Sequence, residues 1–212
     1  MRTIILGKEG NQPFPITADG VSRRHACITI DDAGSWVLED MDSSNGTYIR
    51  NESDGELSRV ARVSITPMTF ICLGPDNAKG CSFYARQVLK ENYGNFTSEY
   101  EYLNEKEELY EEQLQQIEQK SKNLNIVKAV LPVVLLALSV AVVPDMGPVS
   151  WIIRGVASAL PTVLILIFYN PTEMKKEVKA VQDKFSHCPN PCCSGKLTSK
   201  EIRNMRCSKC KK

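Results

Sequence analysis

Short apolar runs separated by turn residues characterise the first 85 residues of the chain. The runs are three to six residues long, are rich in β-branched and aromatic residues, and stop at Gly, Asn, Asp or Pro. Runs of this kind, repeated at this spacing, are typical of an all-β sandwich. The expected strands are Arg2 to Leu6, His25 to Ile30, Trp36 to Glu39, Thr47 to Ile49, Val60 to Ile65, Thr69 to Leu73 and Ser82 to Ala85.

A different pattern begins at Glu99. The segment 98–124 contains no Gly or Pro and is dominated by Glu, Gln, Lys and Leu, which predicts a helical stalk. Apolar residues occupy most a and d positions of a heptad repeat, but Glu107 and Ser121 interrupt it and the run is under four heptads. A parallel homodimeric coiled coil and a single solvated helix therefore both fit. The seam consists of Tyr100, Leu103, Tyr110, Leu114, Ile117 and Leu124.

Two long apolar runs follow the stalk, at 125–143 and 149–169. At about 1.5 Å per residue, a helix of this length spans ~30 Å, the thickness of the hydrocarbon core of a bilayer. A buried helical hairpin in a soluble protein would need a large domain around both helices, and the sequence leaves none. The pattern therefore predicts two transmembrane helices joined by a tight turn at 144–148.

Lysines indicate how these helices are oriented. The turn contains no Lys or Arg, whereas Lys120 and Lys122 precede the first run and four lysines lie between 175 and 184. Because positively charged flanks stay in the cytoplasm, both termini are expected there. No secretory signal is visible at the start of the chain. Reduced cysteines and cytoplasmic termini fit a bacterial inner membrane.

Charge is unevenly distributed, although the net charge is only +1. Residues 1–97 carry 10 basic and 12 acidic side chains, residues 98–125 carry 3 and 8, and residues 171–212 carry 11 and 4. The basic tail could contact nucleic acid or anionic lipid. No aromatic residue follows Phe185 to stack on a base, so nucleic acid is not an expected partner.

Five of the eight cysteines are concentrated in the tail, at 186–212. Cys207 and Cys210 form a Cys-x2-Cys knuckle, and Cys188 can pair with either Cys192 or Cys193 as the second knuckle. Four thiolates suit a closed structural Zn²⁺ site, and a unit this small needs such a site to fold. The segment resembles a zinc ribbon, and this resemblance favours Cys193 over Cys192. His187 is a less favoured ligand.

Three further motifs lie in the turns of the predicted sandwich: Gly7-Lys8, Ser22-Arg23-Arg24-His25 and Ser44-Asn45-Gly46. Their order and spacing closely resemble those of the forkhead-associated (FHA) domain, over about 85 of 212 residues. The resemblance implies an eleven-stranded sandwich over residues 1–90, whose loops at one end bind a phosphothreonine peptide.

The resemblance also assigns roles to these residues. Lys8, Ser22 and Arg23 would face the phosphate, while Ser44 and Asn45 would hold the peptide. Gly7, His25 and Gly46 would be structural. These residue types suit the ligand, because a phosphothreonine carries a charge near −2 and strong acceptor oxygens. Asn can both donate to and accept from a peptide backbone.

One residue departs from the family pattern. Lys8 stands where the family has Arg, which grips phosphate bidentately, whereas Lys offers a point charge. Arg23 and Arg24 could then contribute more of the binding, or the domain could bind unphosphorylated protein. The sequence holds no P-loop, kinase signature or nucleophile elbow, so an enzyme is not expected. The expected function is a membrane-anchored phosphothreonine-binding signalling adaptor; the alternative is a phosphorylation-independent assembly component of a membrane complex.

Overall fold

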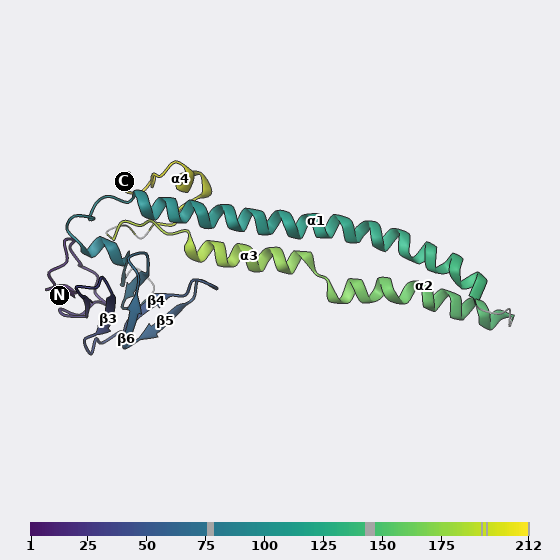
Figure 1. Cartoon of the computed structure of the whole chain (residues 1–212), viewed down its shortest axis with the longest axis horizontal. Helices are drawn as coiled ribbons and strands as arrows, with labels where there is room; N and C mark the ends of the chain where they lie inside the picture. The colour runs from purple at the N-terminus through teal and green to yellow at the C-terminus, as the bar shows by residue number, and fades with distance from the viewer. Residues whose placement is uncertain (76–78, 143–146, 192, 194, 212) are drawn as a thin grey trace. The chain divides into compact units, whose positions relative to one another are not determined.

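The computed structural model of the chain (Figure 1) describes residues 1–75, 79–142, 147–191, 193 and 195–211. It divides into two compact units. One comprises Met1–Glu108 together with Val181–Lys212, and the other comprises Leu109–Ala180. The first unit contains the predicted sandwich and the cysteine-rich tail, and the second contains the apolar helices.

The N-terminal domain is a β-sandwich of two antiparallel sheets, as the sequence predicts. One sheet has the strand order β1-β2-β3-β6, and the other has the order β5-β4-β7-β8. The strands are β1 (Arg2–Leu6), β2 (Ala26–Ile30), β3 (Trp36–Asp40), β4 (Thr47–Arg50), β5 (Leu57–Val60), β6 (Arg62–Ile65), β7 (Phe70–Leu73) and β8 (Cys81–Tyr84).

The described residues form eight strands, fewer than the eleven that the family resemblance implies. Between β1 and β2, side-chain hydrogen bonds hold the chain without any strand pairing. The Ile5 backbone amide donates to Asn11 Oδ1 at 2.7 Å, and the Gln12 side-chain amide donates to the carbonyls of Gly7 and Phe14 at 2.8 and 3.1 Å. This segment is therefore an ordered loop without strand pairing.

The single strand predicted from Val60 to Ile65 is two strands in different sheets, so this prediction was wrong. Val60 pairs with Thr47 in one sheet, and Arg62 pairs with Glu39 in the other. Ala61 lies at the crossing, where its carbonyl accepts from the Asp40 amide at 2.8 Å. The residues before and after Ala61 both favour strand formation, so the sequence shows no boundary between the two strands. Only their pairing partners show that they belong to different sheets.

The core lies between the two sheets. Leu6, Ile28 and Leu38 from the first sheet are fully buried, as are Ile71 and Phe83 from the second. Burying an aliphatic or aromatic side chain of this size contributes about 1.5–3 kcal/mol relative to leaving it exposed. Trp36, at the start of β3, is 8% exposed and belongs to the same core.

Helix α1 (Thr97–Val142) is continuous through the predicted stalk and the first predicted span, with Pro132 inside it. Helix α2 is Pro148–Phe168, and α3 is Pro171–Phe185. Residues 143–146 of the predicted turn lie outside the described part of the chain. Helix α3 was not predicted, although Asn170-Pro171 is a start signal: Asn170 Oδ1 accepts from the Thr172 amide at 3.2 Å.

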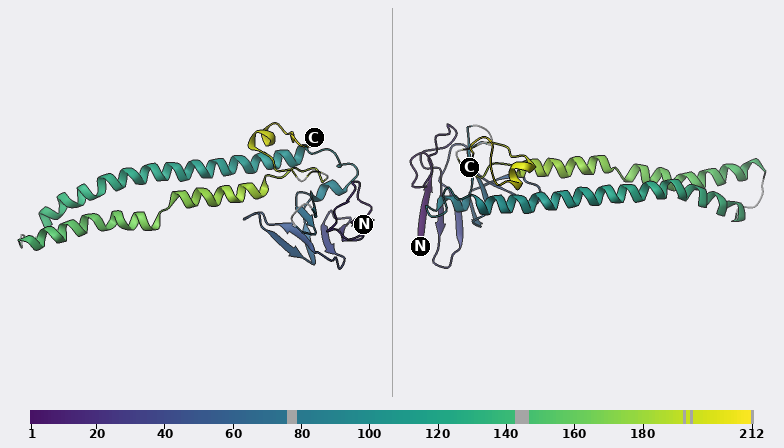
Figure 2. Two further views of the ribbon diagram at one scale, coloured as in Figure 1. Left: turned by 180° about the vertical axis from the view of Figure 1, so that it is seen from behind. Right: turned by 90° about the horizontal axis from the view of Figure 1, so that it is seen from above.

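Within the second unit, α2 and the first part of α3 run alongside α1 (Figures 1 and 2). The Tyr169 hydroxyl donates to the Ile117 carbonyl at 3.3 Å, and Lys175 lies 3.7 Å from Glu118. Both α1 and α2 are long and apolar enough to cross a membrane. Side chains such as Val133 and Ile152 are 67% and 66% exposed, so this chain does not cover its own apolar surface.

The cysteine-rich tail, residues 186–212, packs against the first turns of α1 within the first unit. Helix α4 (Ser199–Arg203) begins with a capping box, in which Thr198 and Glu201 each bond the other's backbone amide. The pattern Thr-x-x-Glu is the sequence signal for this start, and α4 was not predicted. Tyr100 and Leu103, two residues of the predicted coiled-coil seam, are buried among the tail's cysteines.

Candidate functional site

The three sequence motifs meet at one end of the sandwich, where β1 ends and β2 begins. The Lys8 amide donates to the Ser22 carbonyl at 3.2 Å, and the Glu9 amide donates to the Arg23 carbonyl at 2.8 Å. The Ser44 amide donates to Ser22 Oγ at 3.3 Å. Backbone contacts thus bring the first, second and third motifs into one surface.

His25 connects two of these loops from inside the domain. It is fully buried; its Nδ1 accepts from the Ser22 amide at 3.0 Å, and its Nε2 lies 3.0 Å from the Gly46 carbonyl. Because Nδ1 accepts, Nε2 carries the proton and donates to Gly46. Burial lowers the pKa of His25, although the Gly46 carbonyl and the Asp40 carboxylate act to raise it. His25 therefore holds the loops together as a neutral side chain.

Two glycines permit the close approach of these loops. A Cβ on Gly7 would lie 2.3 Å from the Arg23 carbonyl oxygen, so no other residue fits without moving the loop. Gly46 has φ +82°, in the left-handed region that favours glycine, and a Cβ there would lie 2.6 Å from Arg59 Nε. A side chain at either position would therefore displace a neighbouring loop or the Arg59 side chain.

Asp40 organises the third motif, and the sequence analysis missed it. Its carboxylate accepts from the Ser43 and Thr47 hydroxyls at 2.6 and 2.5 Å and from the Ser43 amide at 3.0 Å. Burial acts to raise the pKa of Asp40, but these hydrogen bonds outweigh it and lower the pKa. An Asp three residues before a Ser is a local turn signal that could have identified it.

Exposed polar and cationic side chains surround the surface formed by the loops. Lys8, Arg23, Ser44 and Asn45 are exposed, and Ser22 is half-buried. Lys8 Nζ lies 4.0 Å from Asp19 Oδ1. Asn45 Nδ2 donates to the Gly20 carbonyl at 2.9 Å, and its carboxamide oxygen remains able to accept.

The arginines of this surface carry positive charge that no acidic side chain among the described residues pairs with. Among the described residues, neither Arg23 nor Arg24 forms an ion pair, and both are exposed. Arg59 of β5 lies beside Gly46 and adds a third guanidinium that the sequence did not reveal, because only the pairing of β5 with β4 brings it next to this loop. Guanidinium groups, a hydroxyl and an amide together suit a dianionic ligand rich in acceptor oxygens.

A second cluster lies in the tail, where the side chains of Cys188, Cys193, Cys207 and Cys210 converge. Their sulfur atoms all lie within 4.8 Å of one another, with 3.7 Å between Cys188 and Cys210 and 3.9 Å between Cys193 and Cys207. A disulfide would need about 2.05 Å. Zn–S bonds of about 2.3 Å in a tetrahedron separate the sulfurs by about 3.8 Å, so the spacing fits a metal ion.

The surroundings of the sulfurs also fit a metal. Burial raises the pKa of the Cys188 and Cys193 thiols, while the backbone amides of Asn190 and Gly195 act to lower it and so favour the thiolates. A bound cation would supply the charge that three buried thiolates and the half-buried Cys210 thiolate need. Cys192, the alternative ligand, lies outside the described residues, and His187 instead contacts the Lys184 carbonyl at 3.0 Å.

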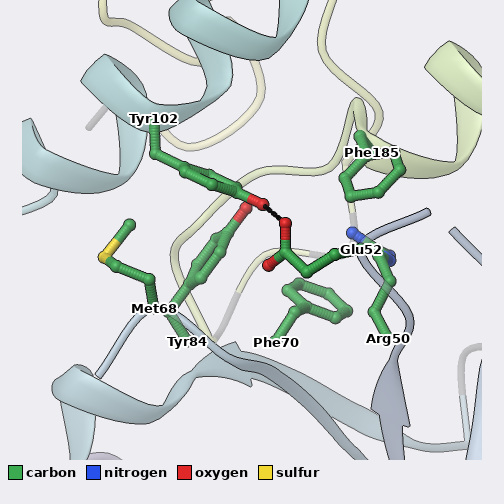
Figure 3. A pocket seen from close by; sticks show the side chains of 7 residues that line it. All are labelled: Arg50, Glu52, Met68, Phe70, Tyr84, Tyr102 and Phe185. Atoms are coloured by element: carbon green, nitrogen blue, oxygen red, sulfur yellow. Dashed lines mark hydrogen bonds between the residues drawn. The ribbon is translucent and has the colours of Figure 1, made fainter. Parts of the chain in front are cut away.

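The outer face of the second sheet is covered by the first turns of α1 and by the tail. The Tyr102 hydroxyl donates to Glu52 at 2.7 Å, and the Arg50 guanidinium stacks 3.7 Å from the Phe70 ring centre. The gap between them is only about 10 Å³, room for about one water and no ligand. Figure 3 shows its lining residues: Arg50, Glu52, Met68, Phe70, Tyr84, Tyr102 and Phe185.

Comparison with known proteins identifies the N-terminal domain. The FHA domain family model matches residues 4–68. An FHA domain from a study of phosphothreonine-dependent FHA domain interactions is 28% identical, covering 38% of this chain and 74% of its own, with a TM-score of 0.30. The FHA domain of FhaA, solved with the intracellular domain of Rv3910, is also 28% identical, covering 38% of this chain and 78% of its own, with a TM-score of 0.30.

The FHA-1 domain of Rv1747 from Mycobacterium tuberculosis is 26% identical, covering 36% of this chain and 72% of its own, with a TM-score of 0.29. No curated protein sequence matches the chain. The family match spans all three motifs, and the sandwich brings those motifs together at one end. The N-terminal domain of this chain is therefore an FHA domain.

Proposed function

We propose that the chain is a membrane-anchored adaptor whose FHA domain binds phosphothreonine peptides on the cytoplasmic side. The observation that carries the proposal is the group of exposed Arg23, Ser44 and Asn45 beside the half-buried Ser22. These side chains converge on loops that His25 holds together from inside. A solved relative, 28% identical, comes from a study of phosphothreonine-dependent FHA domain interactions. The proposed role is binding, in signalling by a Ser/Thr kinase, without enzymatic activity.

The chemistry of the surface supports a phosphate ligand. Ser22 Oγ accepts from the Ser44 amide, so its own hydrogen can be donated to a phosphate oxygen. Arg23 is exposed and forms no ion pair among the described residues, so binding would not require breaking an internal salt bridge. Asn45, fixed by Gly20 at 2.9 Å, is positioned to bond the peptide backbone.

The exposed apolar surface of α1 and α2 supports the membrane anchor. The most apolar window of α1 has a mean hydropathy of 2.2 and is only 6% buried. Exposed apolar helices of this length are stable in lipid and aggregate in water. The lysine distribution favours a two-span hairpin with both termini in the cytoplasm. We propose that the membrane is a bacterial inner membrane.

Zn²⁺ is the metal that best suits the cysteine cluster. Four thiolates with tetrahedral spacing and no open position are typical of structural zinc. The ion would be held by Cys188, Cys193, Cys207 and Cys210, which are far from the FHA motifs in sequence. Its role would be to fold the tail. A homodimer through the stalk stays a prediction.

One observation favours the alternative of a phosphorylation-independent assembly component. Lys8 replaces the family's Arg, and its ammonium lies 4.0 Å from Asp19, which partly offsets its charge. This contact is exposed and so contributes little energy. The alternative therefore requires that Arg23 and Ser22 take no part in binding a phosphate. A binding measurement distinguishes the two functions.

The test uses the full chain in detergent micelles or nanodiscs. A degenerate phosphothreonine peptide library and its unphosphorylated counterpart are titrated, and bound peptides are identified by mass spectrometry. We expect phosphorylated peptides alone to be retained, and Arg23→Gln to weaken retention about tenfold or more. Arg2→Gln is the matched control, because Arg2 is at the opposite end of β1 and pairs with Glu91 at 3.1 Å. Equal retention of both libraries would refute phosphopeptide binding.

A further inference from the structure

Arg59 of β5 lies against the turn formed by the third motif. A Cβ added to Gly46 would lie 2.6 Å from Arg59 Nε and 3.2 Å from Nη2, so the guanidinium occupies the space that any other side chain at residue 46 would fill. Arg59 is directly opposite Tyr48 in the pairing of β5 with β4, and the Tyr48 hydroxyl donates to the Asn45 carbonyl at 3.2 Å. Both side chains therefore reach the turn from the same face of the second sheet.

No acidic side chain among the described residues pairs with Arg59, although its guanidinium is held in place. The side chain is exposed and forms no ion pair within the described part of the chain. Arg62, three residues later, is also exposed but lies 3.7 Å from the Glu39 carboxylate. A guanidinium that is positioned and unpaired can bond an anion from outside without first breaking an internal ion pair.

We propose that Arg59 is a specificity-determining residue of the FHA domain, which selects peptides that carry a second anionic side chain near the phosphothreonine. This inference rests on the proposed phosphopeptide binding. The second anion would be the carboxylate of Asp or Glu, or another phosphate, because the planar fork of a guanidinium bonds either group through two oxygens.

The place of Arg59 along the turn indicates which part of a peptide it would contact. Ser22 bonds the turn at Ser44, where we propose that the phosphate binds, and Arg59 lies against the turn two residues later, at Gly46. Asn45, between them, is the residue proposed to hold the peptide backbone. Two residues of extended chain span about 7 Å, so Arg59 would meet a side chain within about three positions of the phosphothreonine. Because side chains of an extended peptide alternate in direction, only alternate positions can face it.

The test uses the full chain in nanodiscs and phosphothreonine peptides in which each flanking position is fixed in turn as Asp, phosphoserine or Asn. The quantity measured is the ratio of the dissociation constant of the Asn peptide to that of its anionic counterpart. At a flanking position we expect a ratio of about three, as for an exposed ion pair. Arg59→Gln should abolish this preference, and Arg59→Lys, which keeps the charge, should retain part of it. Preference for either anion supports the inference, and the larger ratio identifies the anion that is selected.

Arg62→Gln is the matched control, because it removes the same charge from an exposed arginine of the other sheet and should leave the ratio unchanged. The inference is wrong if the unmodified chain prefers no anion at any flanking position, or if the preference persists in Arg59→Gln. Equal loss in Arg62→Gln would also overturn it, because the effect would then come from net charge. The proposed function is judged separately, by comparing phosphothreonine with threonine in the same peptides: dependence on the phosphate without any anionic preference refutes only the role of Arg59.

Discussion

Glu99, in the first turn of α1, accepts a hydrogen bond 2.5 Å long from the side-chain amide of Gln87, which follows β8. Both side chains are fully buried, and Arg86 lies 3.3 Å from the other carboxylate oxygen. The start of the helix is therefore attached to the FHA domain by a buried polar network. Burial raises the pKa of Glu99, while Gln87 and Arg86 act to lower it.

Removing the Gln87 donor should destabilise this attachment. Gln87→Leu keeps much of the volume but leaves the Glu99 carboxyl without its shortest hydrogen bond, which should lower the free energy of unfolding by about 2 kcal/mol. Denaturant unfolding followed by Trp36 fluorescence, in a Trp151→Phe background, measures the change. In the Glu99→Gln background, the same Gln87→Leu change should cost less, because a neutral amide is cheaper to bury; an equal cost would contradict the role of the carboxylate.

Restoring the family's arginine should strengthen phosphopeptide binding. Lys8→Arg replaces a point charge with a planar fork that can bond two phosphate oxygens, so we expect affinity to rise about fivefold, equivalent to about 1 kcal/mol. Isothermal titration with a phosphopeptide retained by the full chain measures this. Lys90→Arg, at an exposed position outside the three motifs, is the control. Unchanged affinity in Lys8→Arg would mean that residue 8 does not reach the phosphate.

The buried histidine predicts how stability depends on pH. The pKa of His25 is lowered from 6.5 by burial, so the unfolded chain binds more protons than the folded chain just below that value. Its stabilisation is therefore complete above about pH 6.5 and declines as pH falls toward the folded pKa. Unfolding free energies measured between pH 7.5 and pH 5 should fall accordingly.

His25→Gln should flatten this dependence while lowering stability at pH 7.5, because Gln cannot make both bonds with the same geometry. The chain has one other histidine, His187, so His187→Gln is the natural control. If the pH dependence disappeared in His187→Gln and persisted in His25→Gln, the assignment would be reversed.

Metal removal should loosen a defined part of the first unit. After chelation, amide hydrogen exchange should accelerate in the tail and in the first turns of α1, because Phe96, Tyr100 and Leu103 lose their ordered partner. Elemental analysis should find one Zn²⁺ per unmodified chain and none after Cys207→Ser. Cys27→Ser, which changes a cysteine outside the cluster, should retain the metal. Equal metal content in both variants would contradict the assigned ligands.

A charge in the apolar part of α1 should impair membrane insertion. Val133 is 67% exposed near the middle of the first predicted span, and Val133→Arg should cost about 2.5–3.5 kcal/mol on insertion. The measurement is the fraction of chain that resists extraction at alkaline pH. Val133→Leu should insert as the original chain does. Full extraction of the unmodified chain would show that the helices do not span the bilayer.

Much of the architecture could be predicted because it depends on patterns among residues that are close together in the sequence. Alternating apolar runs identified most strands within one residue, and uninterrupted apolar runs identified the regions of α1 and α2. Turn residues with special backbone needs, such as Gly7 and Gly46, were recognisable from the FHA resemblance. The strand prediction failed at Ala61, where a pattern with no local break passes from one sheet to the other.

The sequence by itself determined the residue types: cations and hydroxyls in the loops, apolar runs of bilayer length, and paired cysteines. These follow from composition and periodicity, which depend on neighbours along the chain. Only the tertiary structure decided that Val60 and Arg62 belong to different sheets, that Arg59 lies beside Gly46, and that Tyr100 packs among the tail's cysteines. Such contacts join residues whose approach is set by packing of whole elements, and packing leaves no periodic trace in the sequence.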